Sequence, residues 1–99
     1  MSKVESLMGG GTLQTIKAGL FGSAKDFEVK YQFQLTIEEE NKPGILQGFL
    51  RADEKYKLSP GTSYILLLDD KRKSKVLLGK PVATVKGVVT YGISGQTFD

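Results

Sequence analysis

The chain contains no cysteine and no histidine. Without cysteine, neither a disulfide framework nor a thiolate zinc site can form, and such a chain suits oxidising and reducing compartments alike. Without histidine as well, a transition-metal site, a Ser-His or Cys-His nucleophile and a histidine general base are excluded. We therefore expect a protein that is not an enzyme and that holds no cofactor and no metal.

Long apolar runs are missing too. The longest, Tyr64 to Leu68, has the size of a strand, whereas a membrane-spanning helix needs about 18 apolar residues or more. The N-terminal sequence contains a glutamate and no apolar stretch long enough for the core of a signal peptide. We expect no membrane partner, and a cytoplasmic, intracellular protein is the default.

The composition is that of a folded protein. The chain has 99 residues, of which 39% are hydrophobic and 25% are charged, which indicates one globular domain with one core. Residues 1–11 end in three glycines, Gly9 to Gly11, a composition typical of a flexible spacer. The expected organisation is a flexible N-terminal arm over residues 1–11 and a single β domain over residues 12–99.

The clearest local pattern runs from Phe27 to Glu38, where apolar and polar side chains alternate. This period of two, with its aromatic and β-branched residues, predicts a strand with one face in the core. The apolar face consists of Phe27, Val29, Tyr31, Phe33, Leu35 and Ile37. The opposite face carries Gln32, Gln34 and Thr36, which could contact a ligand or simply face solvent.

Shorter strand signals fill the rest of the chain. They cover residues 12–21, 45–52, 62–68, 75–78 and 82–91, with a helical turn over 53–57 and a polar tail over 92–99. Gly48 lies inside one of these strands, as glycines do at a bulge or at a close backbone approach. About six strands without a long amphipathic helix predict an all-β fold, either an antiparallel β-sandwich or a small β-barrel.

One segment is similar to a known structural device. The sequence Leu58-Ser59-Pro60-Gly61-Thr62-Ser63-Tyr64 resembles the corner of fibronectin type III domains, in which a Leu-x-Pro-Gly-Thr-x-Tyr segment enters a central strand. The resemblance implies that the Tyr64 hydroxyl bonds to the upstream backbone. It covers only Leu58 to Leu68 and describes a local device rather than family membership. Pro60, Gly61 and Tyr64 are therefore expected to form a structural corner.

A basic segment follows this strand, and it supplies the candidate binding residues. These are Lys71, Arg72, Lys73 and Lys75, with Lys86 further along the chain. Basic residues on a barrel loop can bind phosphates. However, charged turns are usually only solvated, and Asp69 and Asp70 offset part of the charge. The net charge of +3 is small for a dedicated nucleic-acid binder.

Two functions remain open at this point. The first is a non-catalytic module for protein–protein interaction, assembly or self-association, with an exposed strand edge as its contact. The alternative is a small OB- or SH3-like barrel that binds nucleic acid through the basic hairpin from Lys71 to Lys75. An enzyme that acts through carboxylates is disfavoured, because the acids of 38–40 and 69–70 are adjacent on turns and have no spacing that would fix two of them on one ligand.

Overall fold

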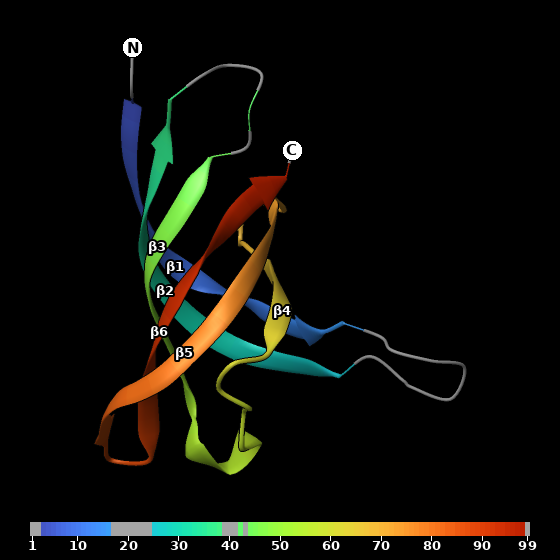
Figure 1. The fold of residues 1–99 in the computed structure, drawn as a ribbon. Coiled ribbons are helices and arrows are strands. Elements are labelled where there is room, and N and C mark those ends of the chain that lie inside the picture. Colours follow the sequence, from blue (N-terminus) through green and yellow to red (C-terminus); the bar gives the residue numbers. More distant parts are fainter. Residues whose placement is uncertain (1–2, 17–24, 39–41, 43, 99) are drawn as a thin grey trace.

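The computed structural model describes residues 3–16, 25–38, 42 and 44–98. These residues form six strands and one short 3-10 helix (Figure 1). The elements are β1 (Lys3–Thr15), β2 (Asp26–Ile37), β3 (Ile45–Asp53), η1 (Glu54–Tyr56), β4 (Ser63–Leu67), β5 (Lys73–Val85) and β6 (Val88–Phe98). All neighbouring strands are antiparallel, and the order β1-β2-β3-β6-β5-β4 closes into a barrel where β4 pairs with β1. The predicted all-β fold is confirmed, and of the two architectures left open it is the barrel.

The core lies inside this barrel, because the buried side chains of the described strands are apolar apart from that of Ser74 in β5. In β2, Val29, Tyr31, Phe33 and Leu35 are buried, as their alternation predicts. The strands around them contribute side chains that are fully buried: Leu13, Leu46, Leu50, Leu66, Val76 and Leu78. The outward-facing residues of the same strands form the surface on which a ligand can bind.

The structure corrects the expectation of a flexible N-terminal arm. Lys3 to Gly11 belong to β1, which pairs with β2 from Lys3–Ile37 to Gln14–Asp26. The glycines permit a close approach here: a Cβ on Gly11 would collide with the carbonyl oxygen of Leu67. Of the strand expected over residues 12–21, Thr12 to Thr15 lie in β1, and residues 17–21 are outside the described part of the chain, as are residues 1–2.

The C-terminal third also differs from the expected pattern. The sequence predicts a strand over 75–78, another over 82–91 and then a tail, whereas β5 continues from Lys73 to Val85 through register shifts at Pro81. Lys86 and Gly87 both have positive φ, 52° and 80°, as in the two-residue turns that join twisted hairpins. The supposed tail is therefore most of β6.

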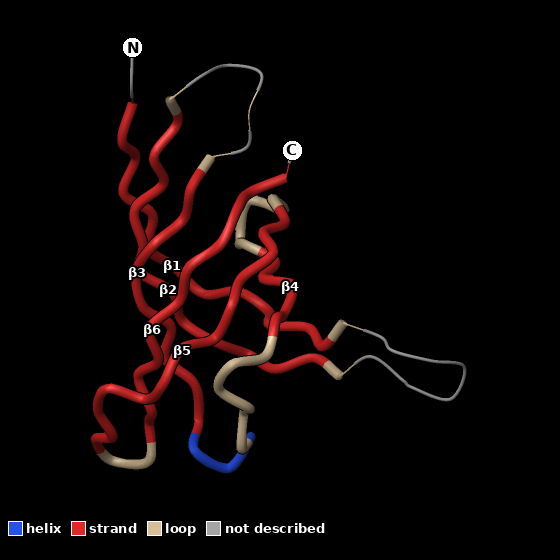
Figure 2. The backbone as a smooth tube through the Cα atoms, in the orientation of Figure 1, coloured by secondary structure: helices blue, strands red, loops and turns tan. Residues whose placement is uncertain are grey.

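The connection from β3 to β4 crosses the end of the barrel and contains the corner. Figure 2 shows it with η1 in blue, at the end away from the N-terminus. The Ser59 backbone N–H donates a hydrogen bond to the Tyr64 hydroxyl at 3.0 Å, the contact that the resemblance implies. Gly61 has φ +86°, a left-handed conformation that suits glycine. The expected helical turn is η1.

Candidate functional site

The outer surface of the barrel is hollowed where β1, β2, β3 and β6 lie side by side. Strand register arranges the outward-facing residues in rows across these strands, because paired residues face the same way. One row consists of Met8, Gln32, Phe49 and Gly92. The next row consists of Gly10, Lys30, Arg51 and Thr90.

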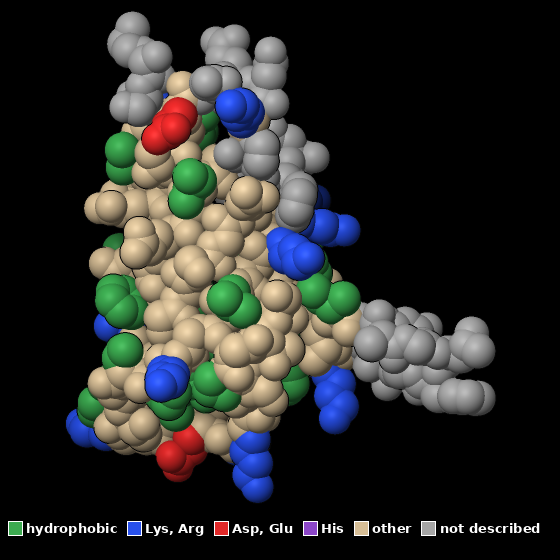
Figure 3. Space-filling view, viewed as in Figure 1, with side chains coloured by type: hydrophobic (Ala, Val, Ile, Leu, Met, Phe, Trp, Pro, Cys, Tyr) green, Lys and Arg blue, Asp and Glu red, His purple; other side chains and the backbone are tan. Residues whose placement is uncertain are grey.

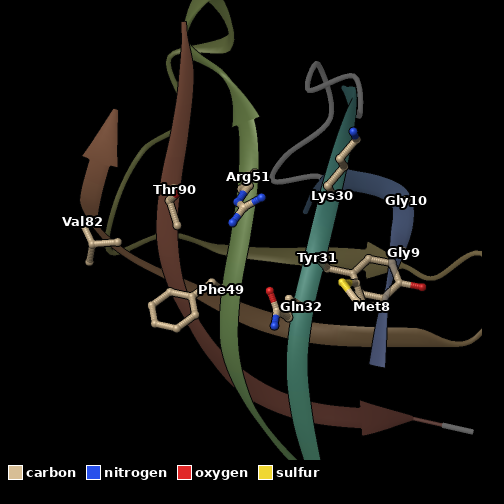
Figure 4. A pocket seen from close by; sticks show the side chains of 10 residues that line it. All are labelled: Met8, Gly9, Gly10, Lys30, Tyr31, Gln32, Phe49, Arg51, Val82 and Thr90. Atoms are coloured by element: carbon tan, nitrogen blue, oxygen red, sulfur yellow. The ribbon is translucent and has the colours of Figure 1, made fainter. Parts of the chain in front are cut away.

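A cavity of about 540 Å³ lies along these two rows, and we call it the central groove. Figure 4 shows its ten lining residues, which are Met8, Gly9, Gly10, Lys30, Tyr31, Gln32, Phe49, Arg51, Val82 and Thr90. Among the described residues, the lining contains two cations and no acid. Two of its apolar side chains face solvent: Phe49 is 50% exposed and Met8 is 76% exposed. Apolar contact area and positive charge are therefore available together.

The central groove opens into a second depression on each side. A cavity of about 820 Å³, the neutral depression, shares Met8, Gln32 and Phe49 with the groove, and none of the described residues that line it is charged. A cavity of about 1450 Å³, the broad trough, shares Gly10, Lys30, Arg51 and Thr90 with the groove. Because they share lining residues, the three cavities are contiguous, and together they offer space for an extended ligand.

The two cations of the groove have no acidic partner in the part of the chain that the structure describes. Among the described residues, no hydrogen bond or ion pair joins the side chain of Lys30 or of Arg51 to an acid. Both residues are exposed. Their charges are therefore available to an anionic group that enters the groove.

Arg72 is one of the residues that the basic sequence segment suggested, and it is held by acids. Its Nε lies 2.7 Å from Asp70 Oδ2, and its Nη2 lies 3.6 Å from Glu5 Oε1. The Arg72 backbone N–H also donates to the Asp70 carboxylate, which lowers the pKa of Asp70, and the guanidinium lowers it further. Arg72 thus stabilises the β4–β5 turn, and its charge is largely compensated.

The remaining basic candidates are spread over the molecule. Lys71 lies in the turn before β5, Lys73 is the first residue of β5, and Lys86 lies in the turn after it. All three are among the residues that line the broad trough. Lys75 is exposed on β5 but is not part of that lining. On the face that β5 and β6 present in Figure 3, Lys and Arg side chains are dispersed singly. The structure therefore does not gather the five candidates into one patch.

Asp69 has a structural contact in the same turn. Its Oδ1 accepts a hydrogen bond of 2.8 Å from the Tyr31 hydroxyl. Burial raises the pKa of Tyr31, and the hydrogen bond to the Asp69 carboxylate raises it further. This contact fastens the turn to β2. The described residues contain no group of three or more acids that could hold a metal ion.

Lys30, Phe49 and Arg51 were not predicted as binding residues from the sequence. The signal was nevertheless present, because Leu46, Leu50 and Ala52 share one face of β3. Strict alternation would have placed Phe49 and Arg51 together on the opposite, outer face. Gln32, which the sequence did suggest as a possible ligand contact, lies in the central groove.

Within the described residues, no helix has the length and hydrophobicity needed to cross a membrane. Comparison of the chain with protein-family models, with curated proteins and with solved structures finds no match.

Proposed function

We propose that this protein binds single-stranded nucleic acid across the outer face of β1, β2, β3 and β6. The observation that carries the proposal is the central groove, in which Lys30, Arg51 and the exposed Phe49 lie together with no acid among the described lining residues. Proteins that bind single strands combine cations along a groove with aromatic rings that stack on bases. The groove offers both in one place.

The charge distribution supports this proposal more than the total charge does. The chain as a whole carries 14 basic and 11 acidic residues, whereas the described residues that line the central groove include two basic residues and no acidic one. The broad trough extends the groove toward Lys71, Lys73 and Lys86, although it also contains Glu28, Asp53 and Asp69. A nucleic-acid strand that follows these cavities meets Lys30 and Arg51 in the central groove, whereas the lysines of the broad trough are interspersed with these acids.

The test is the binding of a labelled oligothymidylate of about 15 nucleotides, a length near the upper footprint of a small single-strand-binding barrel. Fluorescence anisotropy gives the dissociation constant at several salt concentrations. If Lys30 and Arg51 each contact a phosphate, the slope of log K against log salt is about −1.4 or steeper, because each contact on a single strand contributes about −0.7. The affinity then falls at least about sevenfold for a fourfold rise in salt.

Matched variants locate the contact. Lys30→Gln and Arg51→Gln each make the slope shallower by about 0.7. Lys57→Gln removes the same charge from the exposed β3–β4 connection, outside the three cavities, and leaves the slope unchanged. Absence of binding to the unmodified protein at low salt would contradict the proposed function.

A second candidate is docking of another copy of this chain on β5, in line with the assembly function expected from the sequence. β4 pairs with β5 only as far as Ser63–Leu77, so beyond this point no described strand covers that side of β5. Val82 and Val85 are 61% and 63% exposed there. We rank this candidate second because Lys80 and Pro81 interrupt the open edge, and such residues discourage strand pairing.

Light scattering tests the second candidate. Docking of two copies predicts a mass near twice the 10.8 kDa of the chain at high protein concentration. Val85→Lys should return the mass to that of a single chain, because it places a charge in the contact. A wild-type protein that stays at the mass of one chain would exclude this mode of self-association.

A further inference from the structure

Gly92, in β6, is a glycine that the described fold does not require. Other glycines have a visible reason: a Cβ on Gly48 or Gly95 would collide with a neighbouring strand, and Gly61 and Gly87 have positive φ. A Cβ on Gly92 would meet no described heavy atom within 4 Å, and its φ lies outside the positive range. A glycine inside a strand makes the folded protein less stable than an alanine would. Gly92 therefore weakens β6 without any packing benefit among the described residues.

The position of Gly92 suggests a reason for the absence of a side chain there. Gly92 is the register partner of Phe49, and the two face outward together. The Phe49 ring does not cover the glycine, because no ring atom lies within 4 Å of the place that a Cβ on Gly92 would occupy. The surface therefore has an exposed aromatic ring beside a strip of bare backbone, and a strand glycine often marks a close approach by a ligand.

The groups around this position suit a nucleobase. Phe49 lies in the wall shared by the central groove and the neutral depression, and Gly92 lines the neutral depression. Gln32, Gln47 and Ser94 line the same depression and supply amide and hydroxyl groups that can both donate and accept hydrogen bonds. Lys30 and Arg51 lie in the adjacent row. A flat, uncharged, polar-edged ring next to a phosphate matches this arrangement.

We propose that Phe49 and the bare backbone of Gly92 form a platform for one unpaired base, whose flanking phosphates contact Lys30 and Arg51. This inference deepens the proposed function and rests on it. A base paired in a duplex cannot lie against Phe49, because its faces are covered by neighbouring base pairs. The platform therefore selects single strands over duplexes, whereas phosphate contacts alone would not.

The first experiment tests whether the aromatic ring of Phe49 contributes to binding, in comparison with another exposed apolar side chain of β3. Phe49→Leu should weaken oligothymidylate binding by about 5-fold to 140-fold, the range for loss of one stacked base, and Phe49→Tyr should retain it. Ile45 is a matched control, since it is 53% exposed on the same face of β3 and outside the three cavities. Ile45→Ala should bind as the unmodified protein does.

The second experiment uses the glycine itself. Gly92→Ala should keep or raise the midpoint of chemical unfolding, because alanine fits the strand and meets open space. The same change should weaken binding of the oligonucleotide, because the methyl group occupies the place of the base. A structural role for Gly92 would instead lower the unfolding midpoint.

The third experiment reads the stacking directly. The chain contains no tryptophan, so Phe49→Trp introduces a single fluorescent indole at the platform. Its emission should be quenched by oligothymidylate and not by an abasic strand of equal length. If the abasic strand binds the unmodified protein equally well, or if Phe49→Leu and Gly92→Ala bind normally, Phe49 and Gly92 do not form a base platform. The proposed binding of phosphates by Lys30 and Arg51 would remain in that case. If no strand binds at low salt, the platform and the proposed function both fail.

Discussion

The β4–β5 turn (residues 68–72) and the central groove contain similar groups, yet they differ in whether those groups are already engaged. In the turn, Arg72 is paired with Asp70 and Glu5, and Asp69 holds the Tyr31 hydroxyl. In the groove, Lys30 and Arg51 have no acidic partner among the described residues, and Phe49 is half exposed. Positive charge that the fold has compensated stabilises the fold, and only uncompensated charge is available for binding.

The same difference explains why a run of charges is a poor guide to a site. Sequence neighbours such as Asp70 and Arg72 can pair with each other across a turn, so a dense cluster tends to neutralise itself. Lys30 and Arg51 are far apart in the chain and become register partners only when β2 pairs with β3. A site of this kind is created by strand pairing.

The largest expected effect comes from Gly11→Ala, at the place where β1 reaches the end of β4. The added Cβ would collide with the carbonyl oxygen of Leu67, and backbone cannot move aside as a flexible side chain can. We expect a loss of about 2–3 kcal/mol in the free energy of unfolding, as in overpacked cores. Chemical denaturation followed by circular dichroism measures it.

Gly10→Ala is the matched control for this prediction. Gly10 faces the groove, and the nearest atom to its added Cβ is the Val29 carbonyl oxygen at 3.9 Å, an ordinary contact. Its unfolding midpoint should stay the same or rise. If Gly11→Ala and Gly10→Ala destabilise the protein equally, the close approach of Leu67 to Gly11 is not what limits the side chain at this position.

Tyr31→Phe should have the next largest effect, because it removes the hydrogen bond that fastens the turn to β2. Because the acceptor is a charged carboxylate, we expect the free energy of unfolding to fall by about 1–2 kcal/mol. The pKa of Tyr31 is raised in the folded protein, so its contribution is present below the unfolded pKa of about 10 and is lost as pH rises through the folded pKa. The variant should therefore lose less stability than the unmodified protein in urea titrations above about pH 10.

Tyr91, whose pKa is also raised by burial, is present in both proteins and so cancels in this comparison. If the two proteins lose stability in parallel above that pH, the Tyr31 hydroxyl is not held by Asp69 in solution.

The fold was predictable from the sequence where the signal is local. The alternation in β2 predicts its buried face, and the Pro60-Gly61 corner predicts the loop before β4, because both depend on residues close together in the chain. The prediction of an N-terminal arm was wrong. Three consecutive glycines indicate a flexible segment unless it is known that a neighbouring strand packs closely against them. The Lys86-Gly87 turn was missed because lysine adopts positive φ rarely.

The site was less predictable than the fold. Gln32 was suggested by its outward position in an alternating strand, but the groove depends on the register between β1, β2, β3 and β6. Phe49 illustrates the difficulty, because an aromatic residue in a strand is usually assigned to the core. The buried positions of Leu46, Leu50 and Ala52 on the same strand show that Phe49 faces outward.

Tyr64→Phe extends the comparison to the other end of β4, where a polar group is again engaged within the fold. The Tyr64 hydroxyl accepts a hydrogen bond from the Ser59 N–H, and the variant leaves this partly buried donor without its acceptor. We expect a loss of about 1 kcal/mol in the free energy of unfolding and unchanged oligonucleotide binding. An unaltered midpoint in thermal or chemical unfolding would remove the corner role of this residue.

Arg72→Gln should have the smallest effect, and it tests the comparison most directly against Arg51→Gln. The ion pairs of Arg72 are partly exposed, with 31% of its side chain accessible, so their loss should cost only about 0.5 kcal/mol. Because Asp70 and Glu5 already compensate this charge, the salt dependence of oligonucleotide binding should not change. Arg51→Gln should do the opposite, with an unchanged unfolding midpoint and a slope shallower by about 0.7. If Arg72→Gln makes the slope of log K against log salt shallower by as much as Arg51→Gln does, the oligonucleotide contacts the β4–β5 turn as well as the central groove.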